Sequence, residues 1–437
     1  MPLSHYLKCY PSEDQAGHSL LFSTKQASKA VVSNETLETA RSSRLSPANE
    51  RLLARLGMVV PDLSAERRSV AGFFDRCNAC NPELNLIVVL NLDCNFACPY
   101  CFEGDRKGRH YMSRETAGDL TRFVRSHLTA QKERLSVSFY GGEPLLSTDM
   151  IISISRDLGA LAAARKIDYR FNLISNGSLF NRRTAGQLKP LGLQHIKVTL
   201  DGPAEIHNRS RPFRSGAPSF DVIVANIEET CDLVTVNIGG NYTRGNYRSF
   251  VELLDFLAAR GLGHSKIGTV KFDPVADAPM GELRPAGFDG GCRSVDEPWL
   301  QEADPFLREE ILKRGYRTPS FQPITCMVET RDAYVVNFDG SLYKCPAFVG
   351  RPDYAVGTLR SGLADYDDVY RLDNWKNPVC LACEYLPLCY GGCRYMTLVR
   401  TGHLDGLDCQ KHYLDRCLAT YVRQEIKYGR TAGSGPG

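Results

Sequence analysis

The chain has 437 residues, of which 43% are hydrophobic and 24% are charged, and its formal net charge is +3. This length allows two or three domains with their own cores, and the composition excludes a disordered or collagen-like protein. Basic and acidic residues are mixed along the sequence, so the charge pattern gives no support for nucleic-acid binding.

The first residues and the apolar runs predict a cytoplasmic protein without a membrane partner. Residues 1–6 show no basic stretch followed by an apolar segment, which a secretory signal would require. The apolar run at residues 86–90 is much shorter than the roughly 20 residues that a membrane helix needs.

The first part of the chain, residues 1–80, predicts a small α+β domain. Short apolar segments alternate there with polar loops at residues 19–23 and 30–32, and a helical pattern of leucines follows at residues 52–56. Such a domain offers a place where a peptide could be added as a further strand, although the sequence gives no direct sign of an exposed edge.

Residues 81–275 show apolar, β-rich runs that alternate with longer amphipathic stretches. Repeated strand–helix units require right-handed crossovers and a parallel sheet, either open or curled into a barrel, with ligands at the carboxyl ends of the strands. One helix is expected to begin after the cap residue Ser113, and another to cover residues 247–259. The six predicted strands are residues 86–92, 135–140, 167–174, 195–200, 233–239 and 266–272.

The last three segments differ in composition. Residues 276–320 are rich in Gly, Pro and Asp with weak periodicity, and we interpret them as a bridging segment. A cysteine-rich domain is expected at residues 321–427. Residues 428–437 are small and polar and predict a flexible tail.

The chain has sixteen cysteines, and their clustering indicates metal ligands rather than structural thiols. Cys94, Cys98 and Cys101 lie within eight residues, directly after the first predicted strand of the sheet. Three cysteines on a four-iron cluster leave one iron free to bind a small molecule, whereas an electron-transfer cluster normally has four protein ligands. An incomplete zinc site is the weaker alternative, because no nearby Cys or His completes a tetrahedral set.

The C-x3-C-x2-C spacing, with Tyr100 before the last cysteine, resembles the signature of the radical S-adenosylmethionine (SAM) superfamily. The resemblance implies a partial (β/α)6 TIM-like barrel. It also implies that the open iron of a [4Fe–4S] cluster binds the amino and carboxylate groups of SAM, and that an electron from the cluster then cleaves SAM to a 5′-deoxyadenosyl radical, which removes a hydrogen atom from the substrate.

Motifs after the later predicted strands strengthen this resemblance. Residues Gly141, Gly142 and Glu143 are similar to the GGEP motif of the superfamily, and its glycines imply close approach of the backbone to the SAM ammonium group. Ser175 and Asn176 resemble its ribose-side strand end, and Asp201 opens a segment similar to the peptide-modifying branch. His207, Arg209 and Arg211 follow that segment; they either face the substrate or form a solvated surface loop.

Seven further cysteines resemble the pattern of the SPASM domain, which in related enzymes holds two auxiliary four-iron clusters and would bring the total to three [4Fe–4S] clusters. The resemblance assigns Cys380, Cys383, Cys389 and Cys409 to an outer cluster and Cys326, Cys345 and Cys393 to an inner one. Either Cys292 supplies the missing fourth ligand or the inner cluster keeps an open iron. Cys77 and Cys80 are either further ligands or reduced thiols, and a zinc ribbon over residues 380–393 is a weaker alternative because its spacing is atypical.

The resemblance implies that the chain modifies a peptide with SAM as cofactor and an external electron donor such as flavodoxin or ferredoxin. The expected reaction oxidises or crosslinks a ribosomally made precursor peptide through a thioether or carbon–carbon bond, as in geopeptide-type maturases. Pro346 stands where sulfatase maturases carry an acidic residue, which disfavours that reaction. The alternatives are an anaerobic sulfatase maturase, an amine dehydrogenase maturase, or a non-catalytic iron–sulfur electron carrier.

Overall fold

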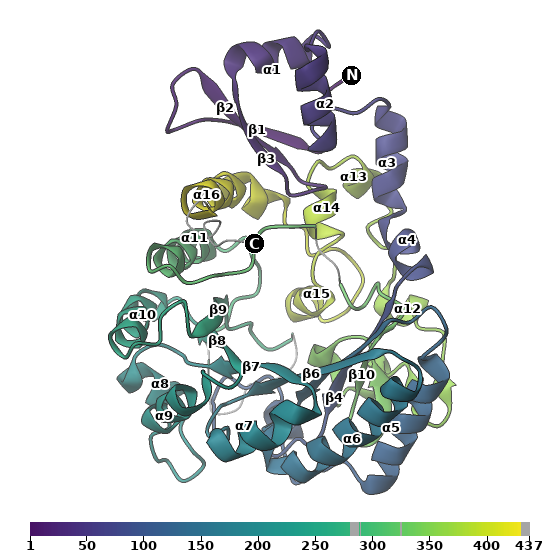
Figure 1. Cartoon of the computed structure of the whole chain (residues 1–437), viewed down its shortest axis with the longest axis vertical. Coiled ribbons are helices and arrows are strands. Elements are labelled where there is room, and N and C mark those ends of the chain that lie inside the picture. Colours follow the sequence, from purple (N-terminus) through teal and green to yellow (C-terminus); the bar gives the residue numbers. More distant parts are fainter. Residues whose placement is uncertain (280–287, 289, 324–325, 430–437) are drawn as a thin grey trace.

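The computed structural model describes residues 1–279, 288, 290–323 and 326–429 (Figure 1). Most of the predicted tail at residues 428–437 therefore lies outside the described residues, as does part of the predicted bridging segment at residues 276–320. None of the described helices is long and apolar enough to cross a membrane.

Six parallel strands, from β4 to the edge strand β9, form one side of a ten-stranded sheet, with helices on its outer side (Figure 1, lower half). Each of these strands was predicted from the sequence, with bounds that differ by a few residues. The strands are β4 Glu83–Val89, β5 Arg134–Tyr140, β6 Asp168–Ser175, β7 Leu193–Thr199, β8 Thr235–Tyr242 and β9 Ile267–Pro274; the helices include α5 Arg114–His127, α6 Thr148–Ala164, α7 Arg182–Leu188, α8 Ala204–Ser210, α9 Phe220–Thr230 and α10 Phe250–Ala259.

The period-two pattern of each strand separates the core from the inner surface of the sheet. In β5, Leu135, Val137 and Phe139 are fully buried, whereas the intervening residues face the other side. Helix α5 begins as predicted, because the hydroxyl of Ser113 accepts a hydrogen bond of 3.0 Å from the backbone N–H of Thr116. Because β4 to β9 pair in parallel, their carboxyl ends lie at one edge of the sheet.

The cysteine-rich part continues this sheet instead of forming a separate one. Strand β10 pairs in parallel with β4, so that Val336 lies opposite Val88, and three short antiparallel strands follow. The remaining residues form short helices and one long C-terminal helix. These elements are β10 Ala333–Val336, β11 Ser341–Tyr343, β12 Gly357–Thr358, β13 Gly362–Leu363, α12 Asp367–Tyr370, α13 Pro378–Leu381, α14 Leu386–Cys389, α15 Arg394–Thr401 and α16 Lys411–Gly429.

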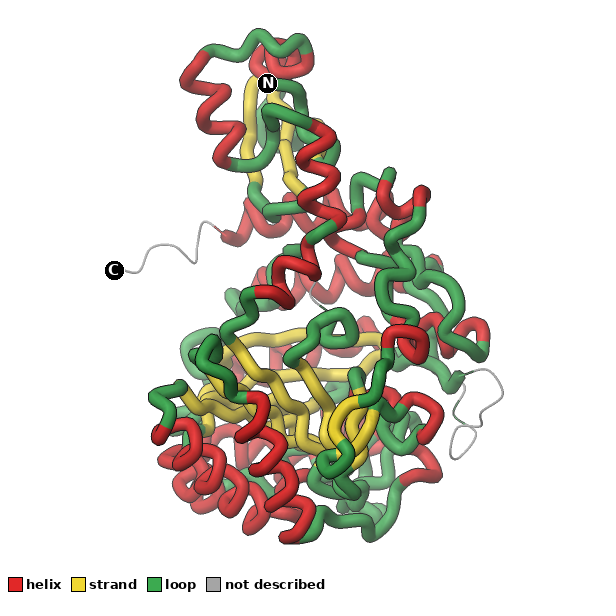
Figure 2. The backbone as a smooth tube through the Cα atoms, turned by 90° about the vertical axis from the view of Figure 1, so that its right-hand side faces the viewer, coloured by secondary structure: helices red, strands yellow, loops and turns green. Residues whose placement is uncertain are grey.

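The N-terminal residues form a three-stranded antiparallel sheet, ordered β1-β2-β3, with helices beside it. This unit packs on the cysteine-rich part: Leu20 and Phe22 of β2 share a core with Tyr385 and Leu418. Figures 1 and 2 show it at the end of the molecule away from the parallel sheet. Its elements are β1 Leu7–Pro11, β2 His18–Ser23, β3 Lys29–Ser33, α1 Asn34–Arg41, α2 Pro47–Arg55, α3 Leu63–Ala71 and α4 Phe73–Ala79.

The bridging segment contains a helix that the sequence analysis missed. Helix α11, Pro298–Lys313, buries Leu300, Ala303, Leu307 and Ile311 at helical spacing against α10 and α16. A proline inside the helix and the polar residues around it made the helical spacing of these apolar residues difficult to recognise in the sequence. The weak periodicity of the bridging segment therefore gave no sign of these sixteen helical residues.

Candidate active site and thiol groups

The loop with the first three cysteines leaves the carboxyl end of β4 and is fixed at its start by Asp93. This nearly buried carboxylate accepts hydrogen bonds from the backbone N–H of Cys94 at 2.9 Å and from the hydroxyl of Tyr111 at 2.5 Å. An ion pair with Arg214 at 2.9 Å completes its partners. The first thiol thus starts from a rigid backbone position.

The three thiols face a cavity of about 460 Å³ at the carboxyl ends of the parallel strands. Most of the residues predicted for the SAM site line the same cavity, although they are up to 82 residues apart in the chain. They are Cys94, Cys98, Cys101, Tyr100, Gly141, Gly142, Ser175 and Asn176. Glu143 and Asp201 lie behind this lining, fully buried.

Gly141 and Gly142 are required by the backbone of the cysteine loop. A Cβ atom on Gly141 would lie 2.3 Å from the carbonyl oxygen of Asn91, and one on Gly142 would lie 2.1 Å from that of Asp93. The N–H of Gly142 donates to the Asn91 carbonyl at 3.0 Å. The backbone at these two glycines therefore lies in close contact with the backbone of residues 91–93. This contact holds the end of β5 against the start of the cysteine loop.

Glu143 acts as a positioning residue for the end of β6. Its carboxylate accepts hydrogen bonds from the N–H of Leu145 at 3.0 Å, the hydroxyl of Ser175 at 2.8 Å and the N–H of Asn176 at 2.8 Å. Asn176 in turn directs its side-chain amide toward the sulfur of Cys94 at 3.9 Å. Burial raises the pKa of Glu143, and its hydrogen bonds oppose that shift.

A second buried carboxylate, Asp201, orients the aromatic residue of the cysteine motif. The hydroxyl of Tyr100 donates to Asp201, and the backbone N–H of Asn241 donates to the same carboxylate at 2.7 Å. Arg211 donates to the Tyr100 hydroxyl at 2.6 Å and lies 3.9 Å from Asp201. Arg211 and Asn241 both line the cavity, so this network brings a buried cation to its wall.

Of the three candidates after Asp201, only Arg211 reaches the cavity. His207 is fully buried, where its Nδ1 accepts the N–H of Asp201 at 3.1 Å and its Nε2 pairs with the Ser219 hydroxyl at 3.1 Å. Arg209 is exposed and pairs with Glu205 at 3.2 Å. His207 therefore packs, Arg209 is solvated, and Arg211 belongs to the site.

Several cavity residues escaped the sequence analysis. Lys107 lines the cavity beside the three thiols, whose charges, that of Cys101 first, raise its pKa against the effect of burial. Lys197 lines it from β7. Glu103 also lines it, and burial raises its pKa to about 7. The alternation of side chains along a strand could have indicated some of these residues. Lys197 and Thr199 lie on the inward face of β7, and Asn241 lies on the inward face of β8.

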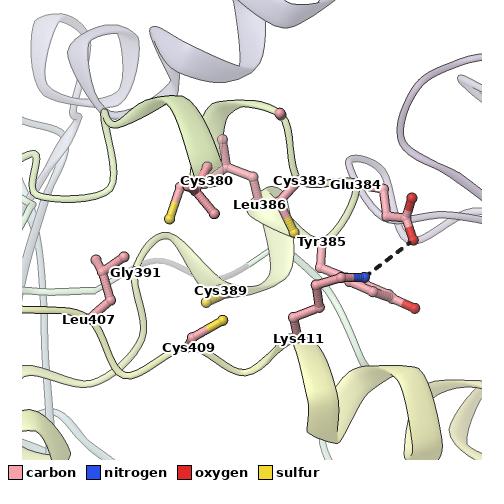
Figure 3. A pocket seen from close by; sticks show the side chains of 12 residues that line it. Cys380, Cys383, Glu384, Tyr385, Leu386, Cys389, Gly391, Leu407, Cys409 and Lys411 are labelled. Atoms are coloured by element: carbon pink, nitrogen blue, oxygen red, sulfur yellow. Dashed lines mark ion pairs between the residues drawn. The ribbon is translucent and has the colours of Figure 1, made fainter.

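Four thiols of the cysteine-rich part converge on a second, smaller pocket of about 230 Å³. Figure 3 shows the sulfur atoms of Cys380, Cys383, Cys389 and Cys409 directed toward a common space from α13, α14 and the loop before α16. Burial and the nearby thiols raise the pKa of Cys389 to about 11. This is the set that the resemblance assigned to the outer cluster.

Cys326, Cys345 and Cys393 form the third group, in which burial and, to a lesser extent, the charges of Cys393 and Cys326 raise the pKa of Cys345. A buried ion pair of 2.5 Å joins Glu329, three residues after Cys326, to Arg394, which follows Cys393. Lys344, just before Cys345, is fully buried and donates to the carbonyls of residues 330 and 333 at 2.6 and 2.5 Å. Each of the three thiols thus has a neighbour that fixes its loop.

The donor sets fit iron–sulfur clusters, because each group consists of thiols, with backbone N–H groups such as that of Phe96 donating to sulfur at 3.4 Å. Over the part of the chain that the structure describes, no three His, Cys, Asp or Glu side chains are close enough to hold a single metal ion. A tetrahedral zinc ion with Zn–S bonds of about 2.3 Å would need such close contact.

The remaining candidate ligands lie apart from these groups. Cys292 is buried beside the end of β9, where its N–H donates to the carbonyl of Val275 at 2.8 Å. Burial and, to a lesser extent, the charges of Glu297 and Asp304 raise its pKa. Cys77 lies in α4, and Cys80 follows this helix as an exposed residue. Their assignment as ligands stays a prediction.

A family model of the radical SAM superfamily matches residues 88–267. These residues form a radical SAM domain. It begins within β4 and contains the first three cysteines together with the cavity residues of β5, β6, β7 and β8.

Relatives and solved structures extend the likeness beyond the radical SAM domain. PqqA peptide cyclase of Gluconobacter oxydans is 24% identical over 75% of this chain and 90% of its own length. A cysteine-type anaerobic sulfatase-maturating enzyme of Clostridium novyi is 22% identical over 78% of the chain and 98% of its own length.

Two solved structures share the fold. The structure of anSMEcpe with bound AdoMet and Kp18Cys peptide has a TM-score of 0.60 at 19% identity and covers 81% of this chain and 100% of its own. SuiB of Streptococcus suis bound to S-adenosylmethionine has a TM-score of 0.54 at 17% identity and covers 94% of this chain and 100% of its own. The predicted α/β fold with a parallel, barrel-like sheet is thus confirmed.

Proposed function

We propose that this chain is a radical SAM enzyme that oxidatively modifies or crosslinks a ribosomally made precursor peptide through a thioether or carbon–carbon bond. The observation that carries the proposal is the cavity, which is lined by the three thiols of the radical SAM domain on one side and by Pro346, Ala347 and Tyr395 of the cysteine-rich part on another. The likeness to a PqqA peptide cyclase supports it, as does the SuiB structure bound to precursor peptide SuiA.

In this proposal Cys94, Cys98 and Cys101 hold a [4Fe–4S] cluster, which supplies the electron for reductive cleavage of SAM. The chain's own residues prepare the site. Lys107 places a positive charge beside the three thiols, and Asn176 directs its side-chain amide toward the sulfur of Cys94. Arg211 and the polar ends of the strands offer a cation and hydrogen-bond donors for the carboxylate of SAM.

Arg211→Lys is expected to weaken SAM binding by about tenfold or more. Lysine keeps the charge but lacks the planar guanidinium group, which can donate hydrogen bonds to a carboxylate and to the Tyr100 hydroxyl at the same time. Equilibrium dialysis with SAM on the reconstituted protein measures this without turnover. Arg209→Lys is the matched control, since Arg209 lies on the exposed surface of α8. Equal affinities for the two variants would remove Arg211 from the SAM site.

The cysteine-rich part is proposed to be a SPASM domain with two auxiliary [4Fe–4S] clusters, which gives three clusters in all. Cys380, Cys383, Cys389 and Cys409 would hold the outer cluster, and Cys326, Cys345 and Cys393 the inner one. An external donor such as flavodoxin or ferredoxin would supply electrons from the cytoplasm. Clusters near the substrate suit a reaction whose radical must give up an electron to form a stable product.

The N-terminal unit is proposed to bind the leader of the precursor peptide as an added strand beside β3. Val31 in this edge strand is 37% exposed. The match to SuiB covers 94% of the chain, and the unmatched residues are too few to make up the whole N-terminal unit, so the likeness to SuiB extends into this unit. Strand addition would supply main-chain hydrogen bonds along β3. Slower amide hydrogen exchange in β3 on peptide binding, with α1 unchanged, would support this placement.

The function is tested by incubating the reconstituted enzyme, SAM and a reductant with short peptides encoded beside its gene, with and without their leader segments. We expect loss of about two hydrogen atoms from one such peptide, measured by mass spectrometry, and a requirement for the leader. A sulfatase-derived peptide is the comparison.

A protein maturase acting on a sulfatase or an amine dehydrogenase is the second candidate, favoured by the sulfatase-maturating relative. Oxidation of the sulfatase peptide alone would select it. Pro346, which lines the cavity directly after Cys345, argues against it because proline cannot act as a base. If the reduced protein never formed 5′-deoxyadenosine, an iron–sulfur electron carrier would be the better description.

A further inference from the structure

Lys197 brings a positive charge to the cavity wall from β7, outside the cysteine loop. Its side chain is 41% exposed, and it lines the cavity together with Thr199, which lies two residues further along the same face of the strand. Pro274 and Val275, at the end of β9 and directly after it, line the same cavity. This part of the wall therefore combines an ammonium group, a hydroxyl group and apolar surface.

The carboxylate that pairs with Lys197 is shared with a second lysine. The Asp273 carboxylate lies 3.7 Å from the Nζ atom of Lys197 and 2.6 Å from the Nζ atom of Lys271, which is on the same strand as Asp273. Only the shorter of these two separations is a hydrogen-bond distance. One negative charge thus faces two positive charges, and the Lys197 ammonium group keeps its capacity to donate hydrogen bonds to a ligand.

The other cations that line the cavity, among the described residues, have closer partners. Arg211 donates to the Tyr100 hydroxyl at 2.6 Å and lies 3.9 Å from Asp201. Lys107 lies beside the three thiols, whose charges act on it. Lys197 is therefore the cation of the cavity wall that is best placed to receive a further negative charge.

The neighbouring strand leaves room for the long side chain of Lys197. A Cβ atom on Gly239 of β8 would lie 2.5 Å from the Cε atom of Lys197, so the stem of the lysine occupies the space that a larger residue would fill. This contact restricts the conformations of the stem before a ligand arrives. A restricted side chain loses less conformational entropy on binding, which favours affinity.

We propose that Lys197 and Thr199 bind a carboxylate of the substrate peptide, carried by an acidic side chain or by the C-terminus. The inference rests on the proposed function and deepens it, because it names an acidic group of the peptide as a recognition element. The ammonium and hydroxyl groups donate to the carboxylate oxygens, and these charge-assisted hydrogen bonds are stronger than neutral ones. Pro274 and Val275 contact the apolar part of the acidic residue.

The test compares three short peptides on the reconstituted, SAM-loaded protein by ligand-observed NMR titration. The first is acetyl-Ala-Ala-Glu-Ala-Ala-amide, the second carries Gln in place of Glu, and the third is acetyl-pentaalanine with a free C-terminus. We expect one of the two acidic peptides to bind about tenfold or more tightly than the Gln peptide, because only a carboxylate forms a charged pair with the ammonium group. The acidic peptide that binds more tightly identifies the source of the carboxylate.

Variants of the two paired side chains locate the bound carboxylate. Lys197→Met should remove the preference for the acidic peptide and leave the affinity for SAM unchanged, whereas Lys197→Arg should keep most of the preference. Asp273→Asn should strengthen binding of the acidic peptide, because it removes the carboxylate that competes for Lys197; a purely structural role of this pair predicts no such gain. Lys313→Met, on the surface of α11, is the matched control and should bind all three peptides as wild type does.

Equal binding of the three peptides to wild type would overturn the proposal. So would a Lys197→Met protein that keeps the preference but binds SAM less tightly, because Lys197 would then belong to the SAM site. The proposed function is judged separately: wild type that cleaves SAM and modifies a peptide without any preference for a carboxylate would refute only the role of Lys197. Wild type that prefers the acidic peptide but never forms 5′-deoxyadenosine would refute only the proposed function.

Discussion

Replacing Cys94, Cys98 and Cys101 with alanine is expected to abolish 5′-deoxyadenosine formation and to reduce the iron content from about twelve to about eight atoms per chain. The reason is that these thiols line the cavity together with Gly142, Asn176 and Arg211. The other two groups of thiols lie on separate loops of the cysteine-rich part, so their iron should remain. Anaerobic iron and sulfide analysis measures the content, and electron paramagnetic resonance identifies which signal disappears.

A Cys231→Ala variant is the control for this experiment, because Cys231 lies at the end of α9 and its thiol contacts a helix carbonyl. It should keep all of the iron and the cleavage activity. Zinc in the purified protein, or a fall to about four irons in the triple variant, would contradict the assignment of two auxiliary clusters.

Replacing Glu329 with alanine is expected to lower the free energy of local opening around Cys326 by roughly 3–5 kcal/mol, because it leaves the Arg394 guanidinium buried without its charge partner. The side chains of Glu329 and Arg394 are only 4% and 3% exposed. Amide hydrogen exchange reports the effect directly, since the N–H groups of residues 329 and 330 both bond to the Cys326 carbonyl, at 3.1 and 3.2 Å.

Two comparisons separate this charge effect from a general loss of packing. The double variant Glu329→Leu/Arg394→Met should recover most of the lost free energy, because apolar side chains of similar size leave no buried charge. The exposed pair Arg182–Asp232 provides the surface control, and Asp232→Asn should change local opening by less than about 1 kcal/mol. Equal effects at the buried and exposed sites would show that the inner group does not depend on its ion pair.

The sequence predicted the elements whose signal is local. The alternating apolar residues of β5 and the cap at Ser113 were readable because period and capping involve residues only a few positions apart. The cavity was anticipated for a related reason: each motif follows a parallel strand, and carboxyl ends of such strands meet at one edge.

Features that depend on distant pairing were not predictable in the same way. Nothing in residues 333–336 indicates that β10 adds to β4, some 250 residues earlier. The buried role of Glu143 and the contact of Lys107 with Cys101 likewise depend on loops that meet only in the folded chain. Helix α11 was missed for a local reason, since Pro305 interrupts a pattern that its buried residues otherwise show.

The pairing of β10 with β4 joins the radical SAM domain and the cysteine-rich part in one sheet. Their thiol groups therefore belong to one rigid body. Cys94 follows β4 and Cys345 follows β11, so the separation of the two thiol groups is set by main-chain hydrogen bonds across neighbouring strands. A mobile electron carrier needs a hinge, whereas this sheet would fix the distance between clusters held by the two proposed groups of ligands. The radical SAM domain and the cysteine-rich part are accordingly not interchangeable modules: separating them would uncover the edge of β4 and leave both halves with unpaired backbone groups.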